Sequence, residues 1–487
     1  MKRKSMTTNG MFSLVAKIVA MLVPLFVYPY VMRVLGAESY GKVTYAESLV
    51  AYFVLLATLG IDNYAQRECS VLRDNSVKLR NKASQVFTIG FTMSLISLCI
   101  YLCCVFFIPD MRSERALFLI FSFMILGSGL SMNWLYTAQE RFDITSIREV
   151  LSKLLYLVLC YTIIRKSDDY ILFGIIVVLT TSVFTMIWNI TGILRHECDI
   201  IPSFKYSSGW QECIKPIFFL ALLTVGSKLF TDSDVIMIKW FTTVESDKAV
   251  GLYNSAIILP KALDTLLMAV SAVITPQLFI AVRGGNEVQV KYLMNRTSNA
   301  LFLISVPAIL TCLFFSEEIL YLFAGGEFVE AAPVLQIYSF IILGVLIITL
   351  AGTRTYVARQ KERKLFRILL FGAGINIGFN ILFIRLWGII GASLATLSAY
   401  VIVMIIELTL ENTWHYVFTK DKLNYLLGGM VIIFVFVISK YIFALSGSIA
   451  LIISVIVAGL VYIVTLYYLK ESTTMLALEK VKGLMNR

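Results

Sequence analysis

The chain has 487 residues, of which 59% are hydrophobic and 15% are charged, and its mean hydropathy is +0.82. Soluble proteins carry about 25% charged residues, so this composition excludes a soluble enzyme, a disordered chain and a secreted disulfide scaffold. The apolar residues suffice for at most about 14 membrane-spanning helices of about 20 residues each. The net charge of +11 does not indicate nucleic-acid binding, because cytoplasmic loops of membrane proteins are rich in Lys and Arg.

Continuous apolar runs divide the sequence, whereas a membrane β-barrel shows alternating polar and apolar residues. They predict an all-α polytopic membrane protein with about 14 transmembrane helices. If the N-terminus is cytoplasmic, roughly two thirds of the Lys and Arg fall in cytoplasmic segments, which predicts that both termini are cytoplasmic. The predicted spans are residues 11–33, 43–62, 84–108, 116–138, 147–164, 170–194, 216–240, 250–281, 299–322, 334–357, 366–385, 387–410, 424–443 and 447–469.

Two short sequence matches indicate an internal repeat. Residues 41–46 (GKVTYA) resemble residues 251–256 (GLYNSA), and residues 136–138 (YTA) resemble residues 356–358 (YVA). Each match falls at equivalent predicted helices, and an even number of spans per half gives both halves the same orientation. The predicted domains are an N-lobe over 1–200 with helices 1–6, a C-lobe over 201–412 with helices 7–12, and residues 413–487 with two extra helices and a cytoplasmic tail.

The sequence offers little for catalysis or for a cofactor. Residues 36–42 resemble a phosphate-binding loop, but Val43 stands where a Ser or Thr must hold Mg²⁺. His196 and His415 lie near loop ends, and the eight cysteines are scattered without metal-ligand spacing. We therefore expect a protein that is not an enzyme and that has no cofactor.

Ionisable residues inside the predicted spans are more informative. Each costs about 2.5–3.5 kcal/mol at a helix centre, so such residues face a cavity or a partner. Lys17 has no acid one helical turn away, and Lys153 has only Glu149, four residues earlier at the edge of its predicted span. These two lysines predict a water-filled cavity that receives an anion. The candidate cavity residues are Lys17, Lys153, Lys228, Lys261 and Glu47.

Two of these lysines have an alternative interpretation. Lys228 lies four residues before Asp232, and Lys261 lies three residues before Asp264. Each pair shares one face of its helix and can form a local ion pair. The sequence leaves both interpretations open.

A second candidate site combines a carboxylate with amide oxygens. Asp234 has no basic residue one helical turn away, and Asn376 and Asn380 share one face of a later helix. Oxygen ligands of this kind suit a hard cation such as Na⁺, with Asp234 as its charged ligand. The alternative is that the two asparagines form hydrogen bonds between helices.

Several motifs, in order along about residues 20–400, resemble those of Wzx-type polysaccharide-biosynthesis flippases (O-antigen, teichoic acid or exopolysaccharide) of the multidrug/oligosaccharidyl-lipid/polysaccharide flippase superfamily. Ala138 and Lys239 stand where this family usually has Gly, and some relatives carry an Asp where Asn380 stands. The motifs are residues 28–41 (YPYVMRVLGAESYG), 133–141 (NWLYTAQER), 168–170 (DDY), 234–238 (DVIMI), 250–254 (VGLYN), Pro276, 324–335 (AGGEFVEAAPVL), Asn376 with Asn380, and 388–396 (GIIGASLAT).

The resemblance implies two six-helix lobes in a V around a central cavity and transport by alternating access. It implies a polyprenyl-pyrophosphate-linked oligosaccharide as substrate, moved from the cytoplasmic to the outer leaflet of a bacterial-type inner membrane for cell-surface polysaccharide assembly. Membrane lipids and other polysaccharide-assembly membrane proteins are the implied partners. Coupling to Na⁺ or H⁺ is associated in relatives with residues that correspond to Asp234, Asn376, Asn380 and Thr396.

Two other functions remain as alternatives. A cation-coupled multidrug or toxin exporter of the same superfamily would favour acids and aromatics in its cavity, whereas the amines here favour an anion. A membrane polysaccharide polymerase or ligase would carry a large outer loop with catalytic Arg or His. The longest predicted outer loop, residues 316–333, is short and contains neither residue.

Overall fold

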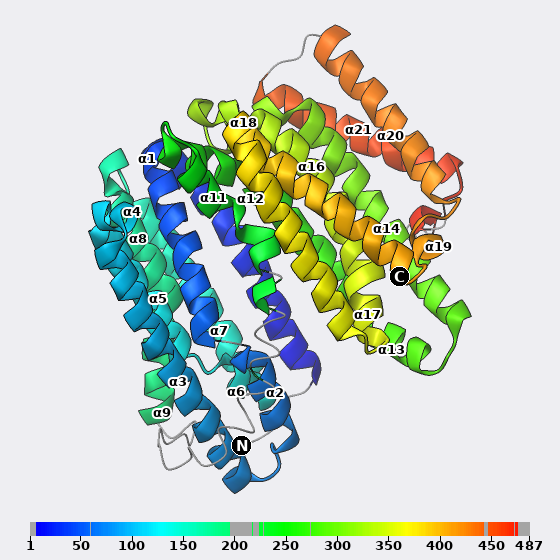
Figure 1. The fold of residues 1–487 in the computed structure, drawn as a ribbon. Helices are drawn as coiled ribbons and strands as arrows, with labels where there is room; N and C mark the ends of the chain where they lie inside the picture. The colour runs from blue at the N-terminus through cyan, green and yellow to red at the C-terminus, as the bar shows by residue number, and fades with distance from the viewer. Residues whose placement is uncertain are drawn as a thin grey trace. The chain divides into compact units, whose positions relative to one another are not determined.

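The computed structural model describes residues 6–58, 60–194, 217, 224–226, 228–272, 274–442, 447–471 and 473–475. These residues are helical with short connections, and none of them lies in a β-strand (Figure 1). The chain divides into two compact units. Unit 1 comprises residues 1–239 and 245–251, and unit 2 comprises residues 240–244 and 252–487. The predicted lobe boundary at residue 200 lies outside the described residues and stays a prediction.

Unit 1 is built from long apolar helices joined by tight turns. Its α7 packs along α1, and α3 packs against both α1 and α5. The elements are α1 (Met6–Thr58), α2 (Ile61–Val71), α3 (Ser76–Phe107), α4 (Pro109–Ser113), α5 (Arg115–Gly129), α6 (Asn133–Ala138), α7 (Phe142–Ile163), η1 (Ser167–Asp169), α8 (Tyr170–Val178), η2 (Leu179–Val183), α9 (Phe184–Leu194) and most of α11 (Asp234–Phe241).

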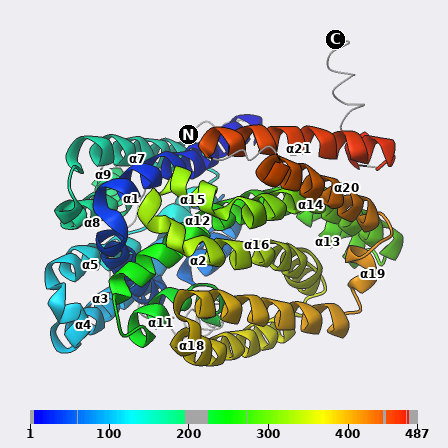
Figure 2. The ribbon, with the colours of Figure 1, turned by 90° about the horizontal axis from the view of Figure 1, so that it is seen from above.

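Unit 2 follows the same plan. Its elements are α12 (Ser246–Ala272), whose first residues belong to unit 1, α13 (Thr275–Arg283), α14 (Glu287–Phe314), α15 (Ser316–Phe323), η4 (Gly326–Ala331), α16 (Ala332–Ile347), η5 (Ile348–Thr353), α17 (Arg354–Ala358), α18 (Glu362–Leu410), α19 (Trp414–Val417), α20 (Lys422–Val437), η6 (Ile438–Ile442) and α21 (Ser448–Tyr468). The last two long helices, α20 and α21, lie side by side in both ribbon views (Figures 1 and 2).

Glycines divide the two longest helices. Gly36 in α1 has φ 75°, and Gly388 in α18 has φ 56°, so neither residue is helical. Side chains with a Cβ rarely adopt this conformation. The first two predicted spans, residues 11–33 and 43–62, are separated by this one non-helical residue, because the helix ends at Leu35 and resumes at Ala37. One glycine is enough to redirect the chain.

Nine helical segments within the described ranges are long and apolar enough to cross a membrane. Two of them contain the breaks at Gly36 and Gly388 and therefore hold two helices each. The remaining predicted spans correspond to α7, α12 and the partly described segment that ends in α11. This helix count is consistent with the fourteen spans expected from the sequence. Many large apolar side chains are exposed on these helices, as lipid contact requires, among them Phe434 (66%) and Leu460 (61%).

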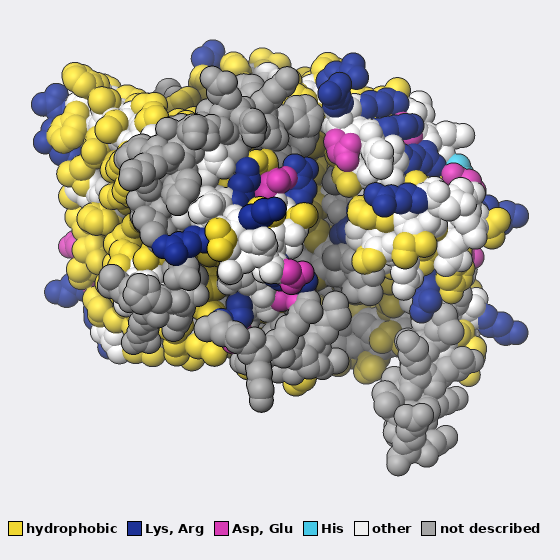
Figure 3. Space-filling model, turned by 90° about the horizontal axis from the view of Figure 1, so that it is seen from below, with side chains coloured by type: hydrophobic (Ala, Val, Ile, Leu, Met, Phe, Trp, Pro, Cys, Tyr) yellow, Lys and Arg dark blue, Asp and Glu magenta, His cyan; other side chains and the backbone are white. Residues whose placement is uncertain are grey.

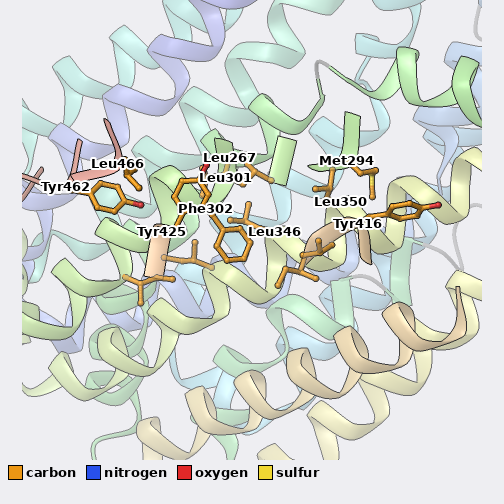
Figure 4. Packing of buried hydrophobic residues seen from close by; sticks show 14 of the residues in the cluster. Leu267, Met294, Leu301, Phe302, Leu346, Leu350, Tyr416, Tyr425, Tyr462 and Leu466 are labelled. Carbon is orange, nitrogen blue, oxygen red and sulfur yellow. The ribbon is translucent and has the colours of Figure 1, made fainter. Parts of the chain in front are cut away.

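The interior of unit 2 is a continuous apolar cluster that includes the last two helices. Phe302 of α14 packs near Tyr425 of α20, with ring centroids 6.3 Å apart. Figure 4 shows Tyr462 and Leu466 of α21 in the same cluster. The extra helices therefore share the hydrophobic core of the unit.

Candidate functional site

A small polar cavity lies inside unit 1, between the two halves of α1 and helices α7 and α8. Its volume is about 60 Å³. Most of its polar groups are hydroxyls, and its two ionisable side chains other than tyrosine are Glu47 and Lys153. The lining residues are Pro24, Tyr28, Tyr40, Thr44, Glu47, Lys153, Tyr156, Phe173, Val177 and Thr181.

The local sequence explains why this cavity forms. The break at Gly36 folds the second half of α1 back, so that Tyr28 and Tyr40 meet edge to face at 6.4 Å. Pro24 lacks a backbone N–H and therefore interrupts the hydrogen-bond pattern of the first half. Thr181 lies in η2, a single π-helical turn that bends the helix on the other side of the cavity.

Glu47 and Lys153 come together although they are far apart in the sequence. Both line the cavity, and Lys153 and Lys228 are the cations that act electrostatically on Glu47. The Lys153 ammonium also lies 5.9 Å from the centre of the Tyr156 ring. The cavity thus combines an amine, a carboxylate and several hydroxyls, which together can bind a polar anionic group.

The other predicted cavity lysines have different surroundings. Lys228 forms an ion pair with Asp232 at 2.5 Å on its own helix, which is the local pairing that the sequence left open. Lys17 is exposed on α1. It precedes Pro24 by seven residues, so it lies on the same helix face about 10 Å away. Lys261 belongs to unit 2 and interacts electrostatically with Asp264, which is buried in the same helix.

The amides of the second predicted site form a hydrogen-bonded chain in unit 2. Asn380 donates to the Oδ1 of Asn376 at 3.0 Å, and Asn376 donates to the Oγ1 of Thr396 at 3.1 Å. All three side chains are fully buried. These hydrogen bonds join the two halves of α18. The sequence analysis gave hydrogen bonding between helices as the alternative to a cation site.

Asp234, the charged member of that predicted site, is buried at the start of α11 in unit 1. The four residues are therefore divided between the two units, and a joint cation site stays a prediction. Among the described residues, no group of three or more His, Cys, Asp or Glu side chains could hold a metal ion.

Arg148, at the start of the predicted span 147–164, is a buried cation that is not among the predicted site residues. It lies in α7 and is 6% exposed. It donates to the Oδ1 of Asn133 at 2.5 Å and to the Oδ1 of Asn189 at 3.3 Å. The two asparagines within apolar runs were the available signal, because a buried amide requires a partner.

The unusual Lys239 has a structural explanation. Its ammonium donates to Asp247 at 2.6 Å and lies 5.7 Å from the centre of the Tyr45 ring. The lysine therefore ties α11 to the start of α12 within unit 1.

These features define a multi-pass α-helical membrane protein with polar and ionisable side chains gathered inside its helix bundles. A family model described as "Polysaccharide biosynthesis protein" matches residues 6–282, which is more than half of the chain. The chain belongs to this family.

Two bacterial relatives match most of the chain. A protein of Shigella dysenteriae, provisionally named an O-antigen transporter, is 24% identical over 396 residues, covering 80% of this chain and 95% of its own. A protein of Escherichia coli (strain K12) with the same provisional name is 20% identical over 377 residues, covering 77% of this chain and 89% of its own.

Solved structures share the fold. The lipid II flippase MurJ in an inward closed conformation has a TM-score of 0.71 at 17% identity, covering 93% of this chain and 98% of its own. An inward-facing multidrug resistance MATE transporter has a TM-score of 0.60 at 13% identity, covering 83% of this chain and 98% of its own. At this identity the likeness shows the fold alone.

Proposed function

We propose that this chain is a transporter and not an enzyme: a flippase that moves a polyprenyl-pyrophosphate-linked oligosaccharide from the cytoplasmic to the outer leaflet for cell-surface polysaccharide assembly. The observation that carries the proposal is Lys153, an amine in a membrane helix that lines a hydroxyl-rich cavity. Such a cavity suits a substrate that has both an anionic group and sugar hydroxyls. Membership of the polysaccharide biosynthesis family and the names of the bacterial relatives support this substrate class.

Lys17 and Lys228 extend this basic character beyond the cavity lining, and Lys261 provides an amine in unit 2. In the proposed mechanism, these amines and Lys153 attract the pyrophosphate, while the polyprenyl chain stays in the bilayer. Glu47 competes with the pyrophosphate for Lys153, so the site releases its anion instead of retaining it. We propose alternating access between the two leaflets, driven by a Na⁺ or H⁺ gradient through Asp234, Asn376, Asn380 and Thr396.

The membrane is proposed to be a bacterial-type inner membrane with both chain termini in the cytoplasm. Arg67, Lys78 and Arg80 are exposed around the turn between α2 and α3. The face seen from below in Figure 3 carries Lys and Arg side chains together with some Asp and Glu. Positive cytoplasmic loops would contribute such Lys and Arg. Other polysaccharide-assembly membrane proteins are the proposed partners.

A depletion experiment in the native host tests the function. The proposal predicts that removal of the protein leaves the complete lipid-linked oligosaccharide in the inner leaflet and stops surface polysaccharide. Plasmid-borne wild-type protein should restore export, as should the variant Lys291→Ala, which changes an exposed lysine. Normal surface polysaccharide without the protein would contradict the proposal, as would lipid-linked sugars that stop growing before completion.

A multidrug exporter is the second candidate because the MATE structures share the fold. It predicts that depletion changes drug sensitivity and leaves the lipid-linked oligosaccharide unaffected. Lys153 in the cavity favours the flippase, because an amine would repel cationic drugs. Glu47 and the aromatic lining residues Tyr28, Tyr40, Tyr156 and Phe173 are the features that an exporter would favour.

A further inference from the structure

Glu407 is a carboxylic acid enclosed in the second half of α18, one turn before the helix ends. Glu407 is 1% exposed. Neither carboxyl oxygen has a hydrogen-bond partner within the part of the chain that the structure describes. Buried carboxyl oxygens normally have such partners. An ionised carboxylate without one is so costly in an apolar interior that the group takes up a proton instead.

The space for this acid is made by one glycine. Gly352 lies in η5, a π-helical turn at the end of α16. A Cβ at this position would overlap the Glu407 carboxyl group, so any larger residue would displace the acid. Single π-helical turns of this kind occur often at functional positions. The acid and the irregular turn therefore form one small built site.

In the described part of the chain, Glu407 forms no ion pair. Helices α16 and α17 and the turn η5 pack against α18. The turn carries no titratable residue, and α16 contributes Tyr338. From α17, Arg354 is hydrogen-bonded to Thr275 and Ser271, on the α12–α13 side.

Tyr356, also from α17, is the titratable neighbour that connects Glu407 to the end of the helix. It is fully buried, its hydroxyl has no hydrogen-bond partner in the described ranges, and it interacts electrostatically with both Glu407 and Glu411. Glu411 follows one turn later and is held by Arg359, Lys361 and Lys364. Tyr356 therefore interacts electrostatically with both acids at the end of α18.

We propose that Glu407 is a proton-binding site of unit 2, which holds a proton in the conformation described here and releases it to water when η5 moves away from α18. The proposal rests on the proposed function, because the bound proton would couple transport to the proton gradient. Glu407 would be a titrating group in addition to the proposed coupling residues Asp234, Asn376, Asn380 and Thr396. A proton-binding acid favours H⁺ over Na⁺ as the coupling ion.

Infrared spectroscopy of the purified full-length protein in lipid nanodiscs tests the proton directly. A protonated carboxylic acid has a carbonyl band that shifts in D₂O, and the difference between wild type and Glu407→Gln at neutral pH should contain one such band. The control Glu317→Gln removes an exposed carboxylate and should give no such band. A difference spectrum for Glu407→Gln without the band would overturn the proposal. Thermal unfolding of both variants confirms that they are folded.

The transport assay separates this proposal from the proposed function. In liposomes with a controlled pH gradient, Glu407→Gln should lose the acceleration that the gradient gives to wild type, while Glu317→Gln keeps it. Equal acceleration in wild type and Glu407→Gln would overturn the coupling role even if the infrared band is present. If wild type moves no lipid-linked oligosaccharide, the proposed function fails, whereas the infrared result still decides whether Glu407 binds a proton.

Discussion

Gly41 and Gly251 make a reciprocal backbone contact that follows the internal repeat of the sequence. A Cβ on Gly41 would overlap the carbonyl oxygen of Asp247, and a Cβ on Gly251 would overlap the carbonyl oxygen of Ala37. Gly41 and Gly251 are 210 positions apart, as are Ala37 and Asp247. Residues at equivalent positions of the predicted repeat therefore contact each other within unit 1.

This contact should tolerate no added side-chain atom. We expect Gly41→Ala and Gly251→Ala each to lower the free energy of unfolding by about 1–3 kcal/mol, because overpacking of this kind forces the backbones apart. Thermal unfolding in detergent measures the loss. Gly459→Ala is the matched control, since its helical glycine has open space around the Cβ position. Equal stability of all three variants would show that the contact is unimportant.

The second expected effect concerns Arg148, which is buried with two asparagine oxygens as its acceptors. Arg148→Met should destabilise the protein by about 1.5–3 kcal/mol, because hydrogen bonds to a charged group are lost and the amides stay buried. Chemical unfolding measures the change, with Arg112→Met, at an exposed position, as control. A stable Arg148→Met variant would indicate that water or a rotated amide replaces the guanidinium.

Ion coupling provides a third prediction. Asp234→Asn keeps the shape of the side chain but removes the charge that a cation would require. We expect slower transport that no longer responds to a Na⁺ or H⁺ gradient, measured in liposomes with each gradient applied separately. Unchanged gradient dependence would assign Asp234 a structural role.

The fourth prediction concerns pH and the carboxyl of Glu411. Its burial would raise the pKa, but hydrogen bonds from Lys361, Lys364 and Arg359 outweigh burial and hold the pKa below its usual value. A depressed pKa adds stability above the ordinary value of about 4.3, and this stability is lost as the pH falls through the folded value.

Measured melting temperatures should therefore separate wild type from Glu411→Gln at pH 7 and bring them together under acid conditions. Parallel melting curves over the whole pH range would contradict this role of Glu411. The exposed Glu317→Gln variant should follow wild type throughout.

Much of the fold could be predicted from the sequence because membrane helices must be apolar over about 20 residues. Apolar runs therefore located the helices. They could not show that Gly36 alone separates the first two predicted spans. The local pair Lys228–Asp232 was also predictable, because helical spacing alone brings the two residues together.

The cavity itself was harder to predict. Glu47 and Lys153 meet through packing of α1 against α7, and no spacing rule connects residues so far apart in the sequence. The internal repeat was predicted in part from residues 136–138 and 356–358. The structure adds that Glu140 (φ 58°) and Gln360 (φ 57°) follow them with the same backbone conformation.

In the proposed mechanism, Lys153 recognises the anionic group of a lipid-linked oligosaccharide during translocation. The most direct measurement follows a polyprenyl-pyrophosphate-linked oligosaccharide across liposomes that contain the full-length protein, using an enzyme that reacts with the sugar on one side only. We expect wild type and Lys291→Ala to move the lipid, while Lys153→Ala, folded and inserted equally well, does not. Translocation by Lys153→Ala at the wild-type rate would show that Lys153 does not recognise the substrate.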